Sequence, residues 1–165
     1  MSITNNIHPL NHLLRPPMIQ WVLQKALPSL ADRAIGFEDM LYILEHRANY
    51  VLINTLPATE QGVLIKHTLS AREEEECVNE FLTKYSETPK SIVLYGRNSC
   101  DESPRKKHAQ LLSLGINEVF IYTGGLFEWL LLQELYGPEE FPTLSSQPGA
   151  AAPDILAYRP KLKIA

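Results

Sequence analysis

Three short runs of apolar and β-branched residues constrain the fold of this chain more than any other feature of its sequence. They read YVLINT at residues 50–55, SIVLY at 91–95 and EVFIY at 118–122. A run of this length without regular polar alternation is typical of a strand that is covered on both faces. Helical patterns separate the three runs. Strands that alternate with helices predict an α/β domain with a mainly parallel sheet and right-handed crossovers.

The stretches between these runs have the periodicity and the end signals of helices. FEDMLYILEH, at residues 37–46, places its apolar residues on one stripe. Ser70 followed by Glu73 opens SAREEEECVNEFLTKY with the spacing of a capping box. Pro104 suits the first turn of PRKKHAQLLSL, in which His108 is interpreted as a solvated surface residue. A fourth helix, LFEWLLLQELYG, follows a Gly-Gly turn.

Both ends of the chain lie outside this alternating pattern, and residues 34–141 are interpreted as the α/β domain. PPMIQWVLQKAL has apolar residues at helical spacing, so residues 1–33 are interpreted as an N-terminal extension with one amphipathic helix. PTLSSQPGAAAP has little apolar bulk, so residues 142–165 are interpreted as a Pro/Gly/Ser/Ala linker and an extended, basic C-terminal tail. The candidates for binding a protein partner are Met18, Trp21, Val22, Tyr158 and Arg159.

Charge and cysteine content argue against several classes of function. The formal net charge of -4 gives no reason to expect a nucleic-acid partner, because binding to phosphates needs a basic surface. Cys77 and Cys100 cannot form a disulfide framework and lack the spacing of a zinc site, so no metal or other cofactor is expected. No apolar run reaches the roughly 18 residues of a membrane span. A cytoplasmic location is expected. Organelle import is the alternative, because the N-terminal segment lacks acidic residues, although this segment holds little of the Ser and Arg that are typical of transit peptides.

The loop between the run at 91–95 and the next helix is the best candidate for a functional site. Parallel sheets place ligands at the carboxyl ends of their strands. A helix start that points into the same loop offers free amides and positive potential, which favour the binding of an anion such as sulfate or phosphate. The candidate residues are Gly96, Arg97, Asn98, Ser99, Cys100, Asp101, Glu102 and Ser103.

From about residue 34 to residue 137, the order of these elements resembles the rhodanese-like family. FEDMLYIL resembles the family's first helix, YVLINT its early strand, and VLIKHTLS a degenerate form of the segment that usually reads His-Ile-Pro-Gly-Ala. SIVLYG resembles the strand before the active loop, and LLSLGINEVFIYTGGLFEW the helix, last strand, Gly-Gly turn and aromatic-bearing helix that follow. GGLFEWLLLQELYG also resembles a branch found in single-celled eukaryotes and large DNA viruses. The resemblance implies a three-layer domain with helices on both faces of the sheet.

The resemblance also implies a residue that this loop lacks. In active members a cysteine directly follows the strand and accepts a sulfane sulfur as a persulfide, while loop amides and basic side chains stabilise the anion. A related phosphatase branch uses the same cysteine. The matching position here holds Gly96, and glycine has no nucleophile. The early strand commonly ends in Asp and then Arg, whereas this chain has Asn54 and Leu56.

Cys100 is the remaining candidate for a catalytic nucleophile, in a rearranged loop. It lies a few residues before a helix start, where a thiolate would be stabilised, and Arg97 could add positive potential. Asp101 and Glu102 follow it directly, however, and should repel both a thiolate and an anionic substrate. Ser99 has no evident base in the sequence that would make it part of a hydrolase triad.

Two functions from different classes follow from these observations. The first is a non-catalytic rhodanese-like domain, a pseudoenzyme that acts as an interaction or structural subunit of a larger assembly. Rhodanese-like domains without the cysteine occur in a protein of centrosomes and cilia, so a cytoskeletal, ciliary or viral assembly is implied. The second is an enzyme, a rhodanese-type sulfurtransferase or redox protein that uses Cys100. We prefer the first, because Gly96 occupies the usual nucleophile position and a fold alone never fixes function.

Overall fold

A four-stranded parallel sheet forms the centre of the structure. The computed structural model describes residues 33–83, 90–145 and 153–161. The strand order is β1-β5-β4-β2, and all neighbours in this sheet are parallel, which confirms the predicted mainly parallel sheet. The strands are β1 (Ala34–Ile35), β2 (Tyr50–Asn54), β4 (Ser91–Tyr95) and β5 (Val119–Tyr122). The three apolar runs of the sequence are thus β2, β4 and β5.

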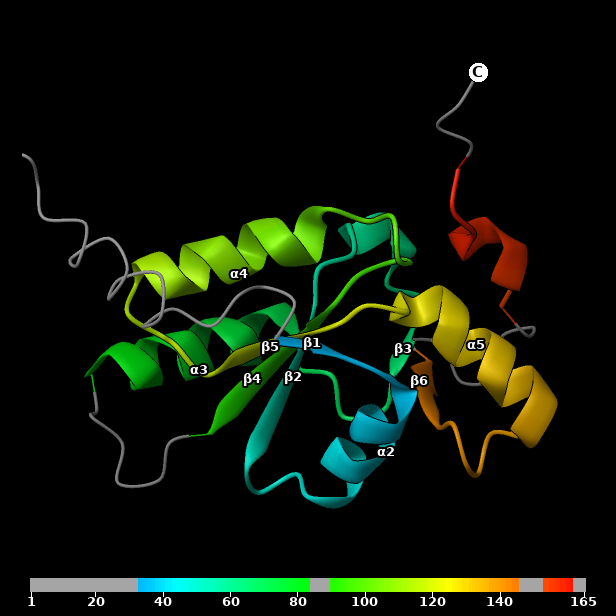
Figure 1. Ribbon diagram of the computed structural model, residues 1–165, viewed down its shortest axis with the longest axis horizontal. Helices are drawn as coiled ribbons and strands as arrows, with labels where there is room; N and C mark the ends of the chain where they lie inside the picture. The colour runs from blue at the N-terminus through cyan, green and yellow to red at the C-terminus, as the bar shows by residue number, and fades with distance from the viewer. Residues whose placement is uncertain (1–32, 84–89, 146–152, 162–165) are drawn as a thin grey trace, which may run out of the picture. The chain divides into compact units, whose positions relative to one another are not determined.

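Four α-helices of the described residues cover the two faces of this sheet (Figure 1). They are α2 (Phe37–Glu45), α3 (Ala71–Thr83), α4 (Ser103–Ser113) and α5 (Gly125–Tyr136). Alternate side chains of a strand point to opposite faces. Val93 and Tyr95 of β4 pack in one core cluster with α2 and α5. Ile92 and Leu94 pack in a second cluster with α3 and α4, so the predicted three-layer α/β architecture is confirmed.

The start of α3 is fixed by the predicted capping box. The backbone N–H and the hydroxyl group of Ser70 donate to Glu73 Oε2 at 2.8 and 2.7 Å, and the Glu73 N–H donates back to Ser70 Oγ at 3.3 Å. These hydrogen bonds from Ser70 hold the pKa of Glu73 below its ordinary value. Cys77 and Val78 pack from α3 toward the sheet, and burial raises the pKa of the Cys77 thiol.

Tyr95, the last residue of β4, is tied to the segment that follows β3 (Val63–Ile65). Thr68 donates its hydroxyl proton to the Ile65 carbonyl oxygen at 2.7 Å. The Tyr95 hydroxyl group therefore donates to Thr68 Oγ1 at 2.8 Å and accepts the Ile65 N–H at 3.2 Å. All three residues are buried, and such a network is stable only when every polar member is paired. It fixes the point at which β4 ends and the loop to α4 begins.

A second, two-stranded sheet lies where the sequence predicts the beginning of a linker. β6 (Thr143–Ser145) pairs antiparallel with β3. Just before β6, Trp129 of α5 donates its Nε1–H to the Pro142 carbonyl oxygen at 3.2 Å, and Phe141 packs against the same ring with 5.0 Å between ring centroids. The pairing was not predicted because a strand of three residues is too short to show a periodicity.

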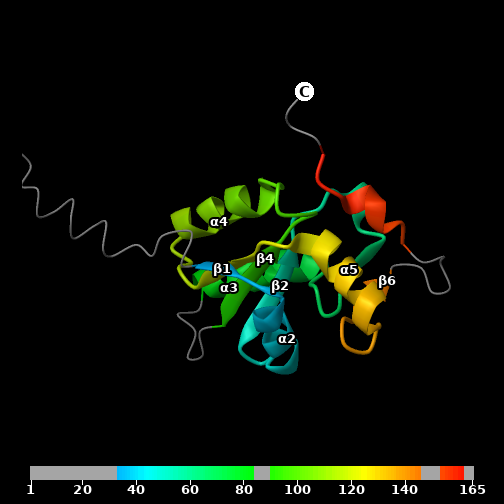
Figure 2. The same cartoon turned by 45° about the vertical axis from the view of Figure 1, so that its right-hand side comes forward.

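The C-terminal segment, residues 153–161, docks on the α/β domain. Its 3₁₀ turn, η3 (Ile155–Tyr158), lies beside the start of α5 in both Figure 1 and Figure 2. Ile155 and Tyr158 pack against the core cluster on the α5 face of the sheet. A second 3₁₀ turn, η2 (Ala58–Glu60), follows β2 and reaches the same region, where Tyr158 contacts it.

His108 lies on the buried face of α4, so the interpretation of this residue as a solvated histidine is wrong. Its exposed fraction is 7%, and burial is the main cause that lowers its pKa. Pro104, His108 and Leu111 are all buried residues of α4. Residues three and four positions apart lie on the same side of a helix, which places His108 against the sheet despite the two lysines that precede it.

Some predictions concern residues that the structure does not describe. The predicted N-terminal helix, with Met18, Trp21 and Val22, lies outside the described residues, so its role in binding a partner stays a prediction. Within residues 33–83, 90–145 and 153–161, no helix is both long and apolar enough to span a bilayer. Within the same ranges, no cluster of three or more His, Cys, Asp or Glu side chains is placed to bind a metal ion.

Candidate functional site

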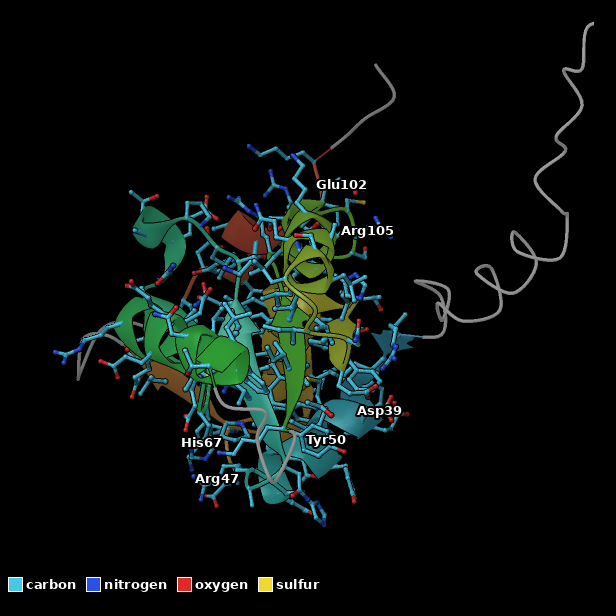
Figure 3. The ribbon with its side chains drawn as sticks, turned by 90° about the vertical axis from the view of Figure 1, so that its left-hand side faces the viewer. Asp39, Arg47, Tyr50, His67, Glu102 and Arg105 are labelled. Carbon is cyan, nitrogen blue, oxygen red and sulfur yellow. The ribbon has the colours of Figure 1, made fainter. Side chains whose placement is uncertain are left out.

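The loop of residues 96–102 joins β4 to α4 at the carboxyl end of the parallel sheet, where the sequence predicts the site. Figure 3 shows Glu102 and Arg105, where this loop meets α4, on the side of the domain opposite Tyr50, the first residue of β2. Ligands bind at this end of open parallel sheets in many α/β proteins. Arg105 Nη1 pairs with Glu102 Oε1 at 2.8 Å on the exposed surface, so the guanidinium group of Arg105 is directed to its neighbour.

The Asp101 carboxylate binds two backbone amides of the loop. Its Oδ2 accepts the Arg97 N–H at 2.8 Å, and its Oδ1 accepts the Ser103 N–H at 2.9 Å. Burial alone would raise the pKa of this carboxyl group, but the hydrogen bonds from Arg97 and Ser103 outweigh it, so the pKa lies below its ordinary value. Two amides that could bind an external anion, one in the loop and one at the start of α4, are therefore bound to a carboxylate of the chain itself.

Gly96, at the position where the resemblance implies a cysteine, has no space for a side chain. A Cβ atom here would lie closer than 3.0 Å to the Asp101 carboxylate and 2.9 Å from Pro104 Cγ. Gly96 is itself buried. Asp101 thus fills the volume that a side chain at position 96 would need.

The start of α5 is bonded to the same loop. The Leu126 N–H donates to the Gly96 carbonyl oxygen and the Phe127 N–H to the Arg97 carbonyl oxygen, each at 2.9 Å. The first amides of a helix have no partner within the helix itself and are common anion sites. Here loop carbonyl groups bind them instead. The sequence predicts the Gly-Gly turn before α5 but not this contact.

Asn98 connects the loop to the C-terminal segment. Its exposed fraction is only 7%. Its Oδ1 accepts the Cys100 N–H at 3.0 Å, and its Nδ2 donates to the Tyr158 carbonyl oxygen at 2.7 Å. Because the loop holds the amide oxygen, the amide nitrogen points toward the C-terminal segment.

Arg97 is also bound on two sides. Its guanidinium group pairs with the Glu60 carboxylate of η2, and its Nη1 donates to the Ala157 carbonyl oxygen at 3.3 Å. The exposed fractions of the Arg97 and Glu60 side chains are 24% and 28%, so this ion pair is largely shielded from water. Arg97 therefore binds Glu60 and the C-terminal segment. Its position in the loop sequence had suggested that its positive charge would bind an external anion.

Cys100 is exposed and lines an open hollow of about 380 Å³ between the loop and the C-terminal segment. Thr55 and Ser103 line the same hollow, and their hydroxyl oxygens are 2.7 Å apart. On the side of the C-terminal segment the hollow is lined by Arg159 and Lys161. The hollow thus combines an accessible thiol with three basic side chains, of Arg97, Arg159 and Lys161, and with the acidic side chain of Asp101.

The structure divides the predicted site residues into a bonded frame and an exposed rim. The frame consists of Gly96, Arg97, Asn98, Asp101 and Ser103, which are linked to one another or to neighbouring segments. The exposed residues of the loop are Ser99, Cys100 and Glu102.

Two further contacts of the site were not predicted from the sequence. Glu60 belongs to a three-residue turn with no recognisable motif, and only the tertiary fold places it beside Arg97. Tyr158 and Arg159, which were predicted to bind a partner, lie against the chain's own loop and hollow. Their role toward another protein stays a prediction.

The fold has counterparts among solved structures, although comparison with protein-family models and with curated protein sequences found no match. A rhodanese-like domain of an Anabaena sp. protein shares 17% identity, over 81% of this chain and 94% of that one, with a TM-score of 0.46. A single-domain sulfurtransferase of Saccharomyces cerevisiae shares 14%, over 63% and 93%, with a TM-score of 0.45. An As-Sb reductase of Leishmania major shares 16%, over 68% and 91%, with a TM-score of 0.45.

Replacing Asp101 by asparagine tests the bonds of the carboxylate without changing its size. The Asn NH₂ group would face one of the two loop N–H groups, so we expect Asp101→Asn to lower the free energy of unfolding by about 1.5 kcal/mol at neutral pH. Because the folded-state pKa of Asp101 is lowered, the loss is fully present above the ordinary value of 3.8 and disappears as the pH falls through the folded-state pKa. Urea unfolding at neutral and acidic pH measures the difference.

The matched control for this experiment is Glu102→Gln, which alters the neighbouring, exposed carboxyl group. Surface substitutions of this kind change stability by about 0.5 kcal/mol or less. Equal unfolding free energies for Asp101→Asn and Glu102→Gln at neutral pH would contradict the bonding described for Asp101.

Proposed function

We propose that the chain is a non-catalytic rhodanese-like domain, which acts by binding protein and not by transferring sulfur. The observation that carries the proposal is the Asp101 carboxylate, which is bonded to the Arg97 and Ser103 amides and fills the space beside Gly96. An anionic substrate would have to displace this charged group, and glycine offers it no nucleophile.

The energetic cost of that displacement supports the proposal. A substrate anion and the Asp101 carboxylate cannot share the same two amides. Two like unit charges 4 Å apart repel by about 4 kcal/mol at an effective dielectric constant of 20. Moving the carboxylate away would instead break hydrogen bonds to a charged group, each of which contributes about 1.5–3 kcal/mol. Either route weakens the binding of an external anion.

The contacts around the loop support a role in binding protein. Arg97 and Asn98 donate to main-chain carbonyl oxygens of the C-terminal segment, so the surface at the end of β4 already holds a piece of polypeptide. Hydrogen bonds to main-chain groups supply the affinity in one recurring mode of peptide recognition, in which an extended peptide adds to the edge of a sheet. An assembly of cytoskeletal, ciliary or viral type is the setting that we propose.

A sulfur-transfer assay tests the absence of catalysis. With thiosulfate as donor and cyanide as acceptor, we expect the full chain to form thiocyanate no faster than the protein-free reaction does. Cys100→Ala and the matched control Cys77→Ala should give the same background rate. Turnover that disappears in Cys100→Ala and persists in Cys77→Ala would overturn the proposal.

The exposure of Cys100 in the hollow favours one alternative function, a sulfurtransferase or redox enzyme. In such a reaction the Cys100 thiolate would attack the outer sulfur of thiosulfate and form a persulfide. The S–S bond of the donor would break, and sulfite would leave with its electron pair. Arg159 and Lys161 lie near enough to line the same hollow and could attract the donor. The assay above distinguishes this alternative from the proposed function.

A further inference from the structure

The C-terminal segment is bound to the loop in the way that a peptide ligand would be. Arg97 Nη1 and Asn98 Nδ2 donate to the carbonyl oxygens of two consecutive residues, Ala157 at 3.3 Å and Tyr158 at 2.7 Å. The Tyr158 hydroxyl group donates to the Glu60 carbonyl oxygen at 3.4 Å. These bonds recognise a backbone turn and one phenol group, so they do not depend on most of the side chains of the segment.

Both side-chain donors are held in position by contacts that do not involve the C-terminal segment. Asn98 Oδ1 accepts the Cys100 N–H, and the guanidinium group of Arg97 pairs with Glu60. With the segment bound, the exposed fraction of Asn98 is 7%, so its hydrogen bond to the Tyr158 carbonyl oxygen is shielded from water. The surface is therefore pre-organised to bind a carbonyl group.

The segment contributes two apolar anchors and forms its own turn. Ile155 and Tyr158 pack against the core, whereas Leu156 between them is 57% exposed. Asp154 Oδ1 accepts the Leu156 N–H, and the Asp154 carbonyl oxygen accepts the Ala157 N–H, each at 3.0 Å. The pattern Asp-Ile-x-x-Tyr thus encodes the turn and presents both anchors on the side that faces the domain.

We propose that Glu60, Arg97, Asn98 and the start of α5 form a docking site for a short peptide turn with the pattern Asp-Ile-x-x-Tyr, and that residues 153–161 occupy it in cis. A protein partner that presents the same turn would displace this segment. Because the segment is tethered, it competes at an effective concentration on the order of millimolar. This inference rests on the proposed function, because it names the class of partner that the interaction domain would bind.

Binding of the segment in trans tests this site on the full chain. In the variant Ile155→Ala/Tyr158→Ala, the chain's own turn loses its anchors and leaves the site open. A fluorescent peptide of residues 153–161, PDILAYRPK, should then bind about tenfold more tightly to the variant than to the unmodified chain, as measured by anisotropy. The peptide with Tyr158→Ala should bind about tenfold more weakly, because it lacks an anchor and the phenol group. The matched control peptide, Leu156→Ala, should keep its affinity.

A second variant keeps the test decisive if Ile155→Ala/Tyr158→Ala fails to fold. Ala157→Pro removes the N–H that bonds to the Asp154 carbonyl oxygen, so it breaks the turn and keeps both anchors in the sequence. The peptide should bind to this variant too and raise its melting temperature. Equal binding to the unmodified chain and to both variants, absence of binding to all three, or equal losses from Leu156→Ala and Tyr158→Ala would overturn the site. These outcomes are independent of the sulfur-transfer assay, so failure of this site and failure of the proposed function are distinguishable.

Discussion

Gly125→Ala is expected to lower the free energy of unfolding by about 4 kcal/mol. Gly125 has a φ of +66°, a conformation that costs an L-residue about 1–2 kcal/mol. Its added Cβ atom would lie 2.7 Å from Asn98 N, 2.8 Å from the Gly96 carbonyl oxygen and 2.9 Å from the Arg97 carbonyl carbon. All three are backbone atoms, so no side-chain rotation relieves the contact, and overpacking of this kind costs a further 1–3 kcal/mol or so. Urea unfolding, or a melting temperature lowered by about 2–4 °C per kcal/mol, measures the change.

Alanine substitutions at two other glycines separate the two contributions to this loss of stability, the backbone strain and the steric contact. Gly115 has a φ of +87° but no atom within 4 Å of an added Cβ, so Gly115→Ala should cost only the strain, about 1–2 kcal/mol. Gly62 has an open environment for a Cβ and no positive φ, and Gly62→Ala should change stability by about 0.5 kcal/mol or less. A Gly125→Ala variant no less stable than Gly115→Ala would show that α5 does not pack tightly on the loop.

The elements that could be predicted from the sequence are those whose signals lie within a few residues of each other. β2, β4 and β5 are continuous apolar runs, and their burial on both faces requires that pattern. The bonds between Ser70 and Glu73 are likewise local, so the capping box could be predicted. β6 and the docked turn η3 could not, because their stability comes from contacts with distant residues. Tyr158, for example, bonds to Glu60, which lies 98 positions away.

The position of the candidate site was predictable, but its chemical state was not. Topology alone places residues 96–103 at the carboxyl end of the sheet. The sequence suggested that Asp101 repels anions from an open loop, whereas the carboxylate binds the amides that would have attracted them. The bond between Asp101 and the Ser103 N–H, two residues further on, is a local turn that the sequence permits. The bond to the Arg97 N–H depends on how the whole loop folds back toward Gly96.

Gly96→Cys, which introduces the residue that the family resemblance implies, is expected to lower the free energy of unfolding by about 3 kcal/mol and to produce no sulfur transfer. The new Cβ atom would lie within 3.0 Å of both the Asp101 carboxylate and Pro104 Cγ. Insertion of atoms into a filled site costs about 1–3 kcal/mol, and here the displaced group is also charged and hydrogen-bonded. Urea unfolding and the thiosulfate assay measure the two effects.

A double-mutant cycle with Asp101→Ala decides whether the carboxylate is the cause of that loss. Without the carboxylate the contact with Pro104 Cγ remains, so adding Gly96→Cys to Asp101→Ala should cost about 1 kcal/mol, a coupling of about 2 kcal/mol. The Arg97 and Ser103 amides would also be free to stabilise the introduced thiol as a thiolate, so its alkylation by iodoacetamide at neutral pH should become faster than in Gly96→Cys alone. Glu102→Ala is the matched control, because this neighbouring carboxylate is exposed and pairs with Arg105, and its effect should add to that of Gly96→Cys within about 0.5 kcal/mol. If the effects of Asp101→Ala and Gly96→Cys on stability were also additive, the Asp101 carboxylate would not occupy the space of the missing side chain. The loop would then be an open anion site that lacks only the cysteine side chain at position 96.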